Sequence, residues 1–230
     1  MALLVSALKW AHKRGTDLPL DVVLNSMAIL WEDEILARSE ERTRRPSQNE
    51  MNAIFEAVLA NKRQKMPVIT VASFAIYSAR RINEICRLRW EDLRVGQGEI
   101  LVRAMKHPRQ KKKNDVWVEL SAEALEIIIS MPRISEFIFP YKSDSISAAF
   151  RRHRDRCMIE DLRFHDLRHD AISRFYEMGE TDYFVMRKSG HKSRQSLDRY
   201  VNVVQVGDKY KNWHWLQWVL DNNRKTGIPR

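Results

Sequence analysis

Cysteine is scarce in this sequence. The 230 residues include two, Cys86 and Cys157, and neither belongs to a CxxC pair or to a cysteine–histidine cluster with the spacing of a zinc site. Two cysteines cannot build the disulfide framework of a small secreted domain. We therefore expect no structural metal and a reducing compartment.

Glycine and proline are also rare, and long hydrophobic runs are missing. Seven residues of each type leave few turn signals and favour helices. No apolar run approaches the roughly 18 residues that indicate a membrane span. The apolar N-terminus, Met1–Leu8, has no basic stretch before it, as a signal peptide would. These absences predict a soluble protein without membrane association, which would be cytoplasmic in a bacterium.

Positive charge is what the sequence has in excess. Forty Lys and Arg residues against thirty Asp and Glu residues leave a formal net charge of +10. This balance favours a polyanionic partner and makes nucleic acid the leading candidate. Charge alone does not establish such binding, because many basic proteins bind no nucleic acid. The 44% hydrophobic content is sufficient for a folded core.

Apolar residues recur at helical spacing along most of the chain. Ser47–Glu50 has the form of a capping box, so a helix should begin at Gln48. The predicted helices cover residues 2–13, 21–42, 48–61, 67–80, 82–90, 121–131, 146–157, 167–178, 183–188 and 193–201, followed by a short amphipathic segment within residues 210–230.

One block between the helices has strand character. Ile100–Val102 and Val116–Val118 are β-branched or aromatic runs, and the very basic segment Lys106–Lys113 separates them. We predict an antiparallel hairpin or three-stranded sheet with a basic turn. The fold class is therefore α+β, mainly α-helical, with a small antiparallel three-stranded β-sheet. The charged run that ends at Pro46 predicts a domain edge, with residues 1–44 before it and 45–230 after it.

Several polar residues that could serve one reaction are dispersed along the chain. Arg81, the segment His165–His169, His191 and Tyr200 are unremarkable one by one. Together they provide what cleavage of a phosphodiester requires: fixed cations on the nonbridging oxygens, a nucleophile, and groups that accept and donate a proton. Arginine suits the first task, because its planar fork makes bidentate, charge-assisted hydrogen bonds.

These segments resemble the motifs of the tyrosine recombinase (phage integrase) family, and they occur in the same order. The resemblance runs from about Arg45 to Asn202. The segments that carry it are Arg81-Ile82-Asn83-Glu84-Ile85, Leu88-Arg89-Trp90-Glu91-Asp92-Leu93, His165-Asp166-Leu167-Arg168-His169, Ser189-Gly190-His191-Lys192-Ser193 and Asp198-Arg199-Tyr200.

The resemblance implies a site-specific DNA recombinase with an integrase-type catalytic domain. Tyr200 would attack the scissile phosphate and form a 3′-phosphotyrosine, and Arg81 and Arg168 would hold the nonbridging oxygens. His191 would donate a hydrogen bond to the same phosphate. His165 would assist proton transfer at the tyrosine. The arginines would supply the charge that Mg²⁺ supplies elsewhere, so no metal or other cofactor is expected.

Further residues take supporting roles by the same resemblance. Lys106 would protonate the leaving 5′-oxygen, and Glu84 would orient Arg81. His169 either packs beside Arg168 or touches the phosphate. The remaining basic residues of the turn, which we expect to contact DNA phosphates or to be solvated, are Arg109, Lys111, Lys112 and Lys113.

The resemblance also implies partners. Strand exchange between two DNA duplexes needs four protomers, so we expect double-stranded DNA, a DNA-bound homotetramer and possible accessory DNA-bending proteins. Residues 1–44 resemble only the end of the family's N-terminal core-binding domain. Two alternatives remain: a catalytically weak or silent DNA-binding remnant or accessory factor, and a type IB topoisomerase.

Several other residues carry expectations that the structure can test. Ala79 and Arg80 stand where the family usually has a glycine and an apolar residue, a departure that slightly alters the approach to the site and puts catalytic efficiency in doubt more than identity. His107, His153 and His214 follow no pattern and are expected at the surface. The tail tryptophans, Trp213, Trp215 and Trp218, either fold onto their own core or dock into a neighbouring protomer.

Overall fold

The computed structural model describes residues 2–33, 35–36, 42–105, 114–200 and 203–226. The chain forms two compact units, Met1–Arg42 and Thr43–Arg230, which are treated separately below. Within the described ranges, no helix is long and apolar enough to cross a membrane.

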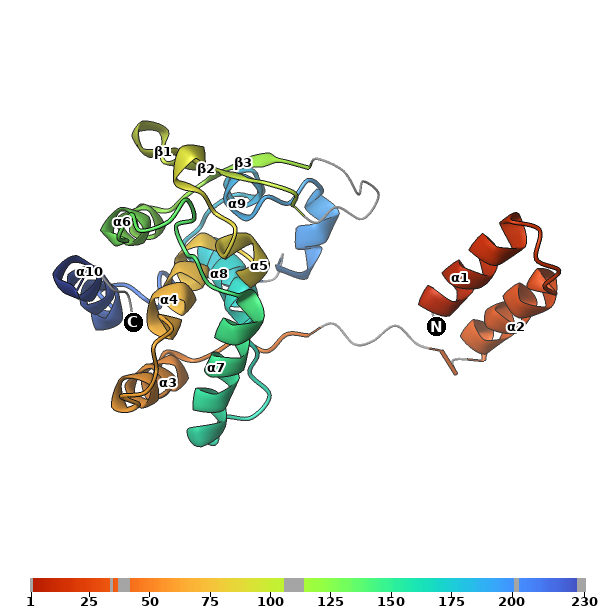
Figure 1. Cartoon of the computed structure of the whole chain (residues 1–230), viewed down its shortest axis with the longest axis horizontal. Helices are drawn as coiled ribbons and strands as arrows, with labels where there is room; N and C mark the ends of the chain where they lie inside the picture. Colours follow the sequence, from red (N-terminus) through yellow and green to blue (C-terminus); the bar gives the residue numbers. More distant parts are fainter. Residues whose placement is uncertain (1, 34, 37–41, 106–113, 201–202, 227–230) are drawn as a thin grey trace. The chain divides into compact units, whose positions relative to one another are not determined.

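The first unit is a pair of helices. Helices α1 (Ala2–Lys13) and α2 (Leu20–Glu32) pack against each other (Figure 1). The prediction of a helix to residue 42 was wrong, because α2 ends at Glu32. No residue of α2 is buried, so tertiary packing does little to extend it. Glu32 and Asp33 also place negative charge at the helix C-terminus, where the macrodipole disfavours it.

The second unit begins with the predicted capping box. Helix α3 (Gln48–Ala60) follows Ser47, whose hydroxyl accepts a hydrogen bond from the Glu50 N–H at 3.2 Å. The Glu50 carboxylate accepts one from the Ser47 N–H at 2.8 Å, which completes the box. The start of the helix is therefore determined by local sequence, as predicted.

Helix α4 (Val68–Ser78) is the centre of the second unit, and every one of its residues is buried. It contacts α3, α6 (Ala122–Ser130), α7 (Ser143–Arg156), α8 (Asp166–Glu177) and α10 (His214–Thr226), and Figure 1 shows these helices around it. A helix that is apolar on all sides is stable only in such a position. It ends at Ala79, which adopts the left-handed conformation with φ 54°.

The predicted three-stranded antiparallel sheet is confirmed. Its strands are β1 (Leu93–Arg94), β2 (Glu99–Val102) and β3 (Val116–Glu119), in the order β1-β2-β3. The β2–β3 register pairs Ile100 with Val118, and both side chains are buried. Beyond the strands, the Met105 N–H donates to the Asn114 carbonyl at 2.8 Å, which brings the two ends of the basic turn together.

The helix predicted over residues 82–90 is wrong beyond its first turn. Helix α5 covers only Ile82–Ile85, and a 3-10 helix follows at Trp90–Asp92. The reason is a long-range pairing. The Trp90 N–H donates to the Glu136 carbonyl at 3.2 Å, and the Ile138 N–H donates to the Leu88 carbonyl at 2.9 Å, so this backbone is extended.

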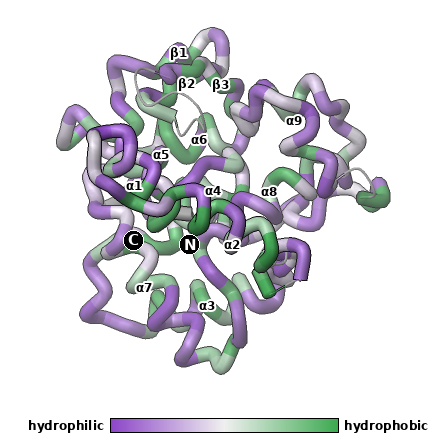
Figure 2. The backbone as a smooth tube through the Cα atoms, turned by 90° about the vertical axis from the view of Figure 1, so that its right-hand side faces the viewer, coloured by the Kyte–Doolittle hydropathy of each residue, from purple (hydrophilic) through white to green (hydrophobic). Residues whose placement is uncertain are grey.

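The last part of the chain carries α9 (Asp182–Ser189) and a 3-10 helix, Arg194–Tyr200, where we predicted an α-helix. The tail tryptophans fold onto their own core: the Trp213 and Trp215 rings lie 5.4 and 5.2 Å from the Phe55 ring. His153 contradicts its prediction as a surface residue. It is 1% exposed because α7, which is hydrophilic over most of its length (Figure 2), turns this side chain inward.

Candidate active site

Arg81 is held at the entrance to α5. Its backbone N–H donates to Glu84 Oε2 at 3.1 Å, and its guanidinium donates to Glu84 Oε1 at 2.7 Å. The Arg81 side chain remains 30% exposed, whereas that of Glu84 is 2% exposed. The buried carboxylate therefore orients a guanidinium that still reaches solvent.

Arg168, on the first turns of α8, connects three segments that are distant in sequence. It donates to the Ala79 carbonyl before α5 and to the Ser189 carbonyl at the end of α9, the second at 3.2 Å. Its Nη2 lies 3.2 Å from His191 Nε2, and its Nη1 lies 4.0 Å from Glu84 Oε2. Arg168 thus shares Glu84 with Arg81 and contacts His191 directly.

His191 follows a turn that needs glycine. Gly190 has φ 71°, and a Cβ at this position would clash with Met105 Cε and lie 3.3 Å from Arg80 Nη1. His191 Nδ1 lies 2.7 Å from Ser189 Oγ. Burial, followed by the charges of Arg168, Arg81 and Arg80, lowers the pKa of His191 to about 3. His191 is therefore neutral, and its Nε2 accepts from Arg168, which can only donate.

Arg80 is a member of this cluster that the sequence analysis missed. Its side chain is fully buried, and Nη2 donates to the Lys188 carbonyl at 2.5 Å. Nη1 lies 3.7 Å from Glu84 Oε2. Burial lowers the pKa of Arg80 to about 10 and, with help from Arg80 and Arg81, that of Arg168 to about 9. Three guanidiniums surround one carboxylate, so the site carries excess positive charge.

The tyrosine is positioned by the same helix as Arg168. Tyr200 Oη lies 2.7 Å from His169 Nδ1, and the Tyr200 ring stacks on that of Tyr176 at 6.1 Å between centroids. His165 stands at the start of α8, and its ring meets that of His169 edge-on at 5.1 Å. Tyr200 is 6% exposed. Helix α8 therefore connects the arginine cluster with the phenol.

The structure brings together most of the residues that the sequence analysis selected. Arg81, Glu84, Arg168 and His191 form one network, and α8 joins it to His165, His169 and Tyr200. The selected residues that lie outside the described ranges are Lys106, Arg109, Lys111, Lys112 and Lys113. The residues on either side of this segment are described. Met105 packs at Gly190, and Lys192 donates to the Asn114 side chain, so Met105 and Asn114 lie beside the His191 segment.

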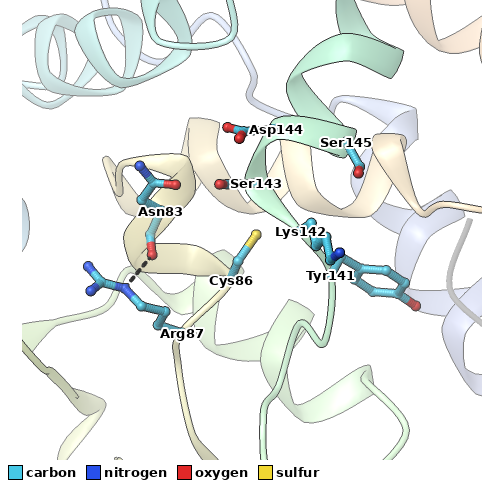
Figure 3. Close-up of a pocket in the computed structure, with 8 residues that line it drawn as sticks. All are labelled: Asn83, Cys86, Arg87, Tyr141, Lys142, Ser143, Asp144 and Ser145. Atoms are coloured by element: carbon cyan, nitrogen blue, oxygen red, sulfur yellow. Dashed lines mark hydrogen bonds between the residues drawn. The ribbon is translucent and has the colours of Figure 1, made fainter.

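Two other features of the described residues do not indicate a second catalytic site. Among the described residues, no group of three or more His, Cys, Asp or Glu side chains is arranged to hold a metal ion. A cavity of about 500 Å³ is lined by Asn83, Cys86, Arg87 and Tyr141–Ser145 (Figure 3). Its lining includes none of the site residues predicted from the sequence. Arg87 Nε donates a hydrogen bond to the Asn83 carbonyl at 2.8 Å.

The structure therefore defines a mainly helical domain with a small sheet, in which guanidiniums, imidazoles and a phenol gather around helix α8. The sequence profile described as the phage integrase family matches residues 44–205. The chain belongs to this family.

Individual relatives agree. The chain is 30% identical over 203 residues to the shufflon-specific DNA recombinase of Escherichia coli. This alignment covers 86% of this chain and 47% of the relative. It is 26% identical over 157 residues to the integrase of Salmonella phage P22, covering 60% of this chain and 40% of the relative. The chain thus spans about half the length of the curated relatives it matches.

Solved structures share the fold. DNA-bound lambda integrase superposes with a TM-score of 0.55 at 20% identity, covering 91% of this chain and 81% of that one. XerA recombinase gives a TM-score of 0.51 at 17% identity, covering 93% of this chain and 78% of that one. The predicted integrase-type catalytic fold is confirmed.

Proposed function

We propose that this chain cleaves and rejoins DNA strands through a covalent 3′-phosphotyrosine on Tyr200, as the catalytic part of a site-specific recombinase. One observation carries the proposal: Arg81 and Arg168 share the buried carboxylate of Glu84, and the helix that holds Arg168 also holds the phenol through His169. Cations and nucleophile are therefore kept in one place before substrate arrives.

The charge of the site suits a phosphodiester. Three guanidiniums against one carboxylate leave positive charge uncompensated, and a phosphate monoanion would supply the missing partner. Cleavage builds further negative charge on the nonbridging oxygens, which Arg81 and Arg168 stabilise by charge-assisted hydrogen bonds. Because these cations are part of the protein, the reaction proceeds without a metal or other cofactor.

The covalent step preserves the energy of the broken bond. Tyr200 Oη attacks phosphorus and the 5′-oxygen leaves, with Lys106 as its proton donor. A 5′-hydroxyl from another strand then attacks the phosphotyrosine and releases the tyrosine, so rejoining needs no ATP. His191 takes part once its Nε2 carries a proton that it can donate to the phosphate. The negative phosphate favours that proton, because it offsets the surrounding guanidiniums.

Double-stranded DNA is the proposed substrate. A groove of about 380 Å³ borders His165, and its lining includes Arg151, Arg154 and Arg163 beside Asp144 and several apolar side chains. We propose that these arginines contact the DNA backbone near the site. A lambda integrase with the same fold forms a tetramer on a Holliday junction. For this chain we propose a DNA-bound homotetramer, with accessory DNA-bending proteins as further partners.

The first unit takes the role of part of a core-binding domain in this proposal. Residues 1–44 would add phosphate contacts to those of residues 45–230, which would hold the chemistry. Affinity should therefore depend strongly on salt, since each neutralised phosphate releases a counterion.

The test is trapping on a nicked suicide duplex in EDTA. Wild-type protein should form a protein–DNA adduct that Tyr200→Phe abolishes. An adduct that requires a divalent metal would indicate a nuclease, and relaxation of supercoiled DNA without sequence preference would indicate a type IB topoisomerase. DNA binding with no adduct at any pH would leave the catalytically silent accessory factor.

A further inference from the structure

We infer that Ser189 is a positioning residue that lets His191 change its hydrogen-bonding role when a DNA phosphate enters the site. In the free protein the Ser189 hydroxyl accepts from Nδ1–H of the imidazole, and in the DNA complex it donates to the same nitrogen. This inference rests on the proposed function and deepens it. The observation behind it is the 2.7 Å separation between Ser189 Oγ and His191 Nδ1.

Ser189 belongs to the site through both its main chain and its side chain. It is the last residue of α9, it is fully buried, and its carbonyl accepts from Arg168 Nη2 at 3.2 Å. Gly190 then turns the chain in the left-handed conformation, and the imidazole of His191 returns to the serine hydroxyl. Both ring nitrogens are therefore held, Nδ1 by Ser189 and Nε2 by Arg168 at 3.2 Å.

The donors and acceptors of the free protein follow from Arg168. A guanidinium can only donate, so Nε2 of His191 accepts from it. The ring is neutral, because burial, followed by the charges of three neighbouring arginines, outweighs the opposing charge of Glu84 and lowers its pKa to about 3. A neutral imidazole carries one hydrogen, which is then on Nδ1 and is donated to Ser189 Oγ.

A phosphate reverses these roles. Its nonbridging oxygens only accept, and they draw the Arg168 guanidinium into charge-assisted hydrogen bonds. Nε2 of His191 then loses its donor and faces an acceptor, so it can bind the phosphate only when it carries the hydrogen. Nδ1 gives its proton to water and Nε2 takes one from water, so the charge of the ring does not change. The Ser189 O–H turns toward Nδ1 and donates to its lone pair.

A hydroxyl suits both states because it can accept and donate at one position. A carboxylate at residue 189 could only accept, and it would hold the hydrogen on Nδ1. An aliphatic side chain would leave a buried ring nitrogen without a partner in both states. A second proton on the ring would add a charge beside three guanidiniums that share one carboxylate, Glu84. The exchange through Ser189 gives the phosphate a neutral donor instead.

The first test locates the hydrogen of His191 directly. Nitrogen NMR of histidine-labelled Tyr200→Phe protein is recorded with and without the nicked duplex that gives the adduct in wild-type protein, and His191→Phe assigns the signals. The free protein should carry the hydrogen on Nδ1, and the complex should carry it on Nε2 alone. A free protein with the hydrogen on Nε2, or a complex with hydrogen on Nδ1, would overturn the inference.

The second test is a double-mutant cycle in single-turnover adduct formation at saturating duplex. His191→Phe removes a donor to the phosphate and should slow the reaction roughly 10²–10³-fold. Ser189→Ala should slow it roughly tenfold, the order of effect expected for one hydrogen bond. In the His191→Phe background the serine substitution should have no further effect, because Ser189 acts through the imidazole. An equal loss in both backgrounds would indicate a merely structural role and would contradict the inference.

Ser73→Ala is the matched control. Ser73 is also fully buried, but its Oγ makes no hydrogen bond within the described part of the chain. This variant should keep the wild-type rate, and equal slowing by the two serine variants would assign the loss to packing and defeat the inference. If wild-type protein formed no adduct dependent on Tyr200, the proposed function would fail first. A Tyr200 adduct without the change at His191 would defeat the inference alone.

Discussion

Glu84 is the carboxylate that Arg80, Arg81 and Arg168 share. Burial raises its pKa, but Arg80, Arg168 and Arg81 outweigh that effect, and the net pKa lies below the ordinary value. A carboxyl whose pKa is lowered by folding stabilises the fold above its unfolded pKa. The contribution is lost as the pH falls through the folded value.

Glu84→Gln removes the one carboxylate among three guanidiniums. Leaving buried charges without their partner should lower the free energy of unfolding by about 3–5 kcal/mol at pH 7. Urea unfolding from pH 7 down to pH 3 measures this. The difference between wild-type and variant protein should shrink below about pH 4.5 as the wild-type carboxyl gains its proton. A constant difference across this range would contradict the electrostatic explanation.

Arg80→Met tests how the buried guanidinium of Arg80 affects the stability of the fold. Methionine fills similar space and removes a buried cation whose Nη1 makes no hydrogen bond to any described residue and lies 3.7 Å from Glu84 Oε2. It also forfeits the hydrogen bond to the Lys188 carbonyl. Exchanging buried ion pairs for apolar side chains is often neutral or stabilising by about 1–4 kcal/mol, and Glu84 keeps Arg81 and Arg168 as partners in this variant. We expect a thermal midpoint equal to or above that of the wild type, together with slower adduct formation. A marked loss of stability would show that the buried Arg80 guanidinium stabilises the fold, contrary to this prediction.

At the scale of elements, the turn between α9 and His191 determines how the imidazole approaches Arg168. Gly190→Ala has to place a side chain in left-handed backbone and against Met105 and Arg80. The backbone alone costs about 1–2 kcal/mol. Gly179→Ala is the matched control, since Gly179 also has positive φ, 85°, but its nearest neighbour would lie 3.5 Å from the new Cβ.

The two glycine variants should therefore differ. We expect Gly190→Ala to lose more stability than Gly179→Ala by roughly 1–3 kcal/mol, the usual cost of overpacking, and to slow adduct formation. Met105→Ala should restore part of that loss in the double variant, because it removes the crowding atom. Equal unfolding free energies for the two single variants would contradict the crowding account.

Local signals in the sequence predicted some elements correctly. The capping box at Ser47 and the β-branched runs around Ile100 and Val118 act through neighbours in the chain, so they could be predicted without the fold. Helix α5 could not, because the pairing of Leu88 with Ile138 stops it after one turn. The end of α2 was missed since the apolar pattern continues past the last helical residue.

The site residues also divide into those that the sequence could predict and those that depend on tertiary contacts. The motif residues Arg81, Arg168, His191 and Tyr200 could be selected because their order and spacing resemble a family. Arg80 was taken as a departure, since its burial depends on the Lys188 carbonyl and Glu84, which only the folded chain brings to it. Likewise, the sequence placed His169 beside Arg168, but its contact with Tyr200 is tertiary.

At the scale of the whole second unit, a buried ion network joins its beginning to α8 and to the segment after the tyrosine. Asp170, on α8, is fully buried and pairs with Arg45 at 2.9 Å and Lys209 at 2.6 Å. The Tyr210 hydroxyl donates to the same carboxylate at 3.0 Å. Arg45 also forms a two-pronged bond with Glu177 at 2.7 and 3.1 Å.

Arg45→Met should therefore destabilise the second unit. Asp170 would keep two partners but lose one cation, so we expect the free energy of unfolding to fall by about 1–3 kcal/mol. Arg44→Met is the control, because Arg44 pairs with Glu50, which is about one quarter exposed. A partly exposed pair of this kind contributes about 0–1 kcal/mol. Equal effects in urea unfolding would argue against the buried network.

The most direct test of the account is to identify the amino acid that becomes linked to DNA. Wild-type protein is incubated with the nicked duplex in EDTA, the adduct is digested, and the DNA-bearing peptide is sequenced by mass spectrometry. The account predicts a single peptide that carries a 3′-phosphate linkage on Tyr200. Attachment at another residue, or an adduct that persists in Tyr200→Phe, would contradict it.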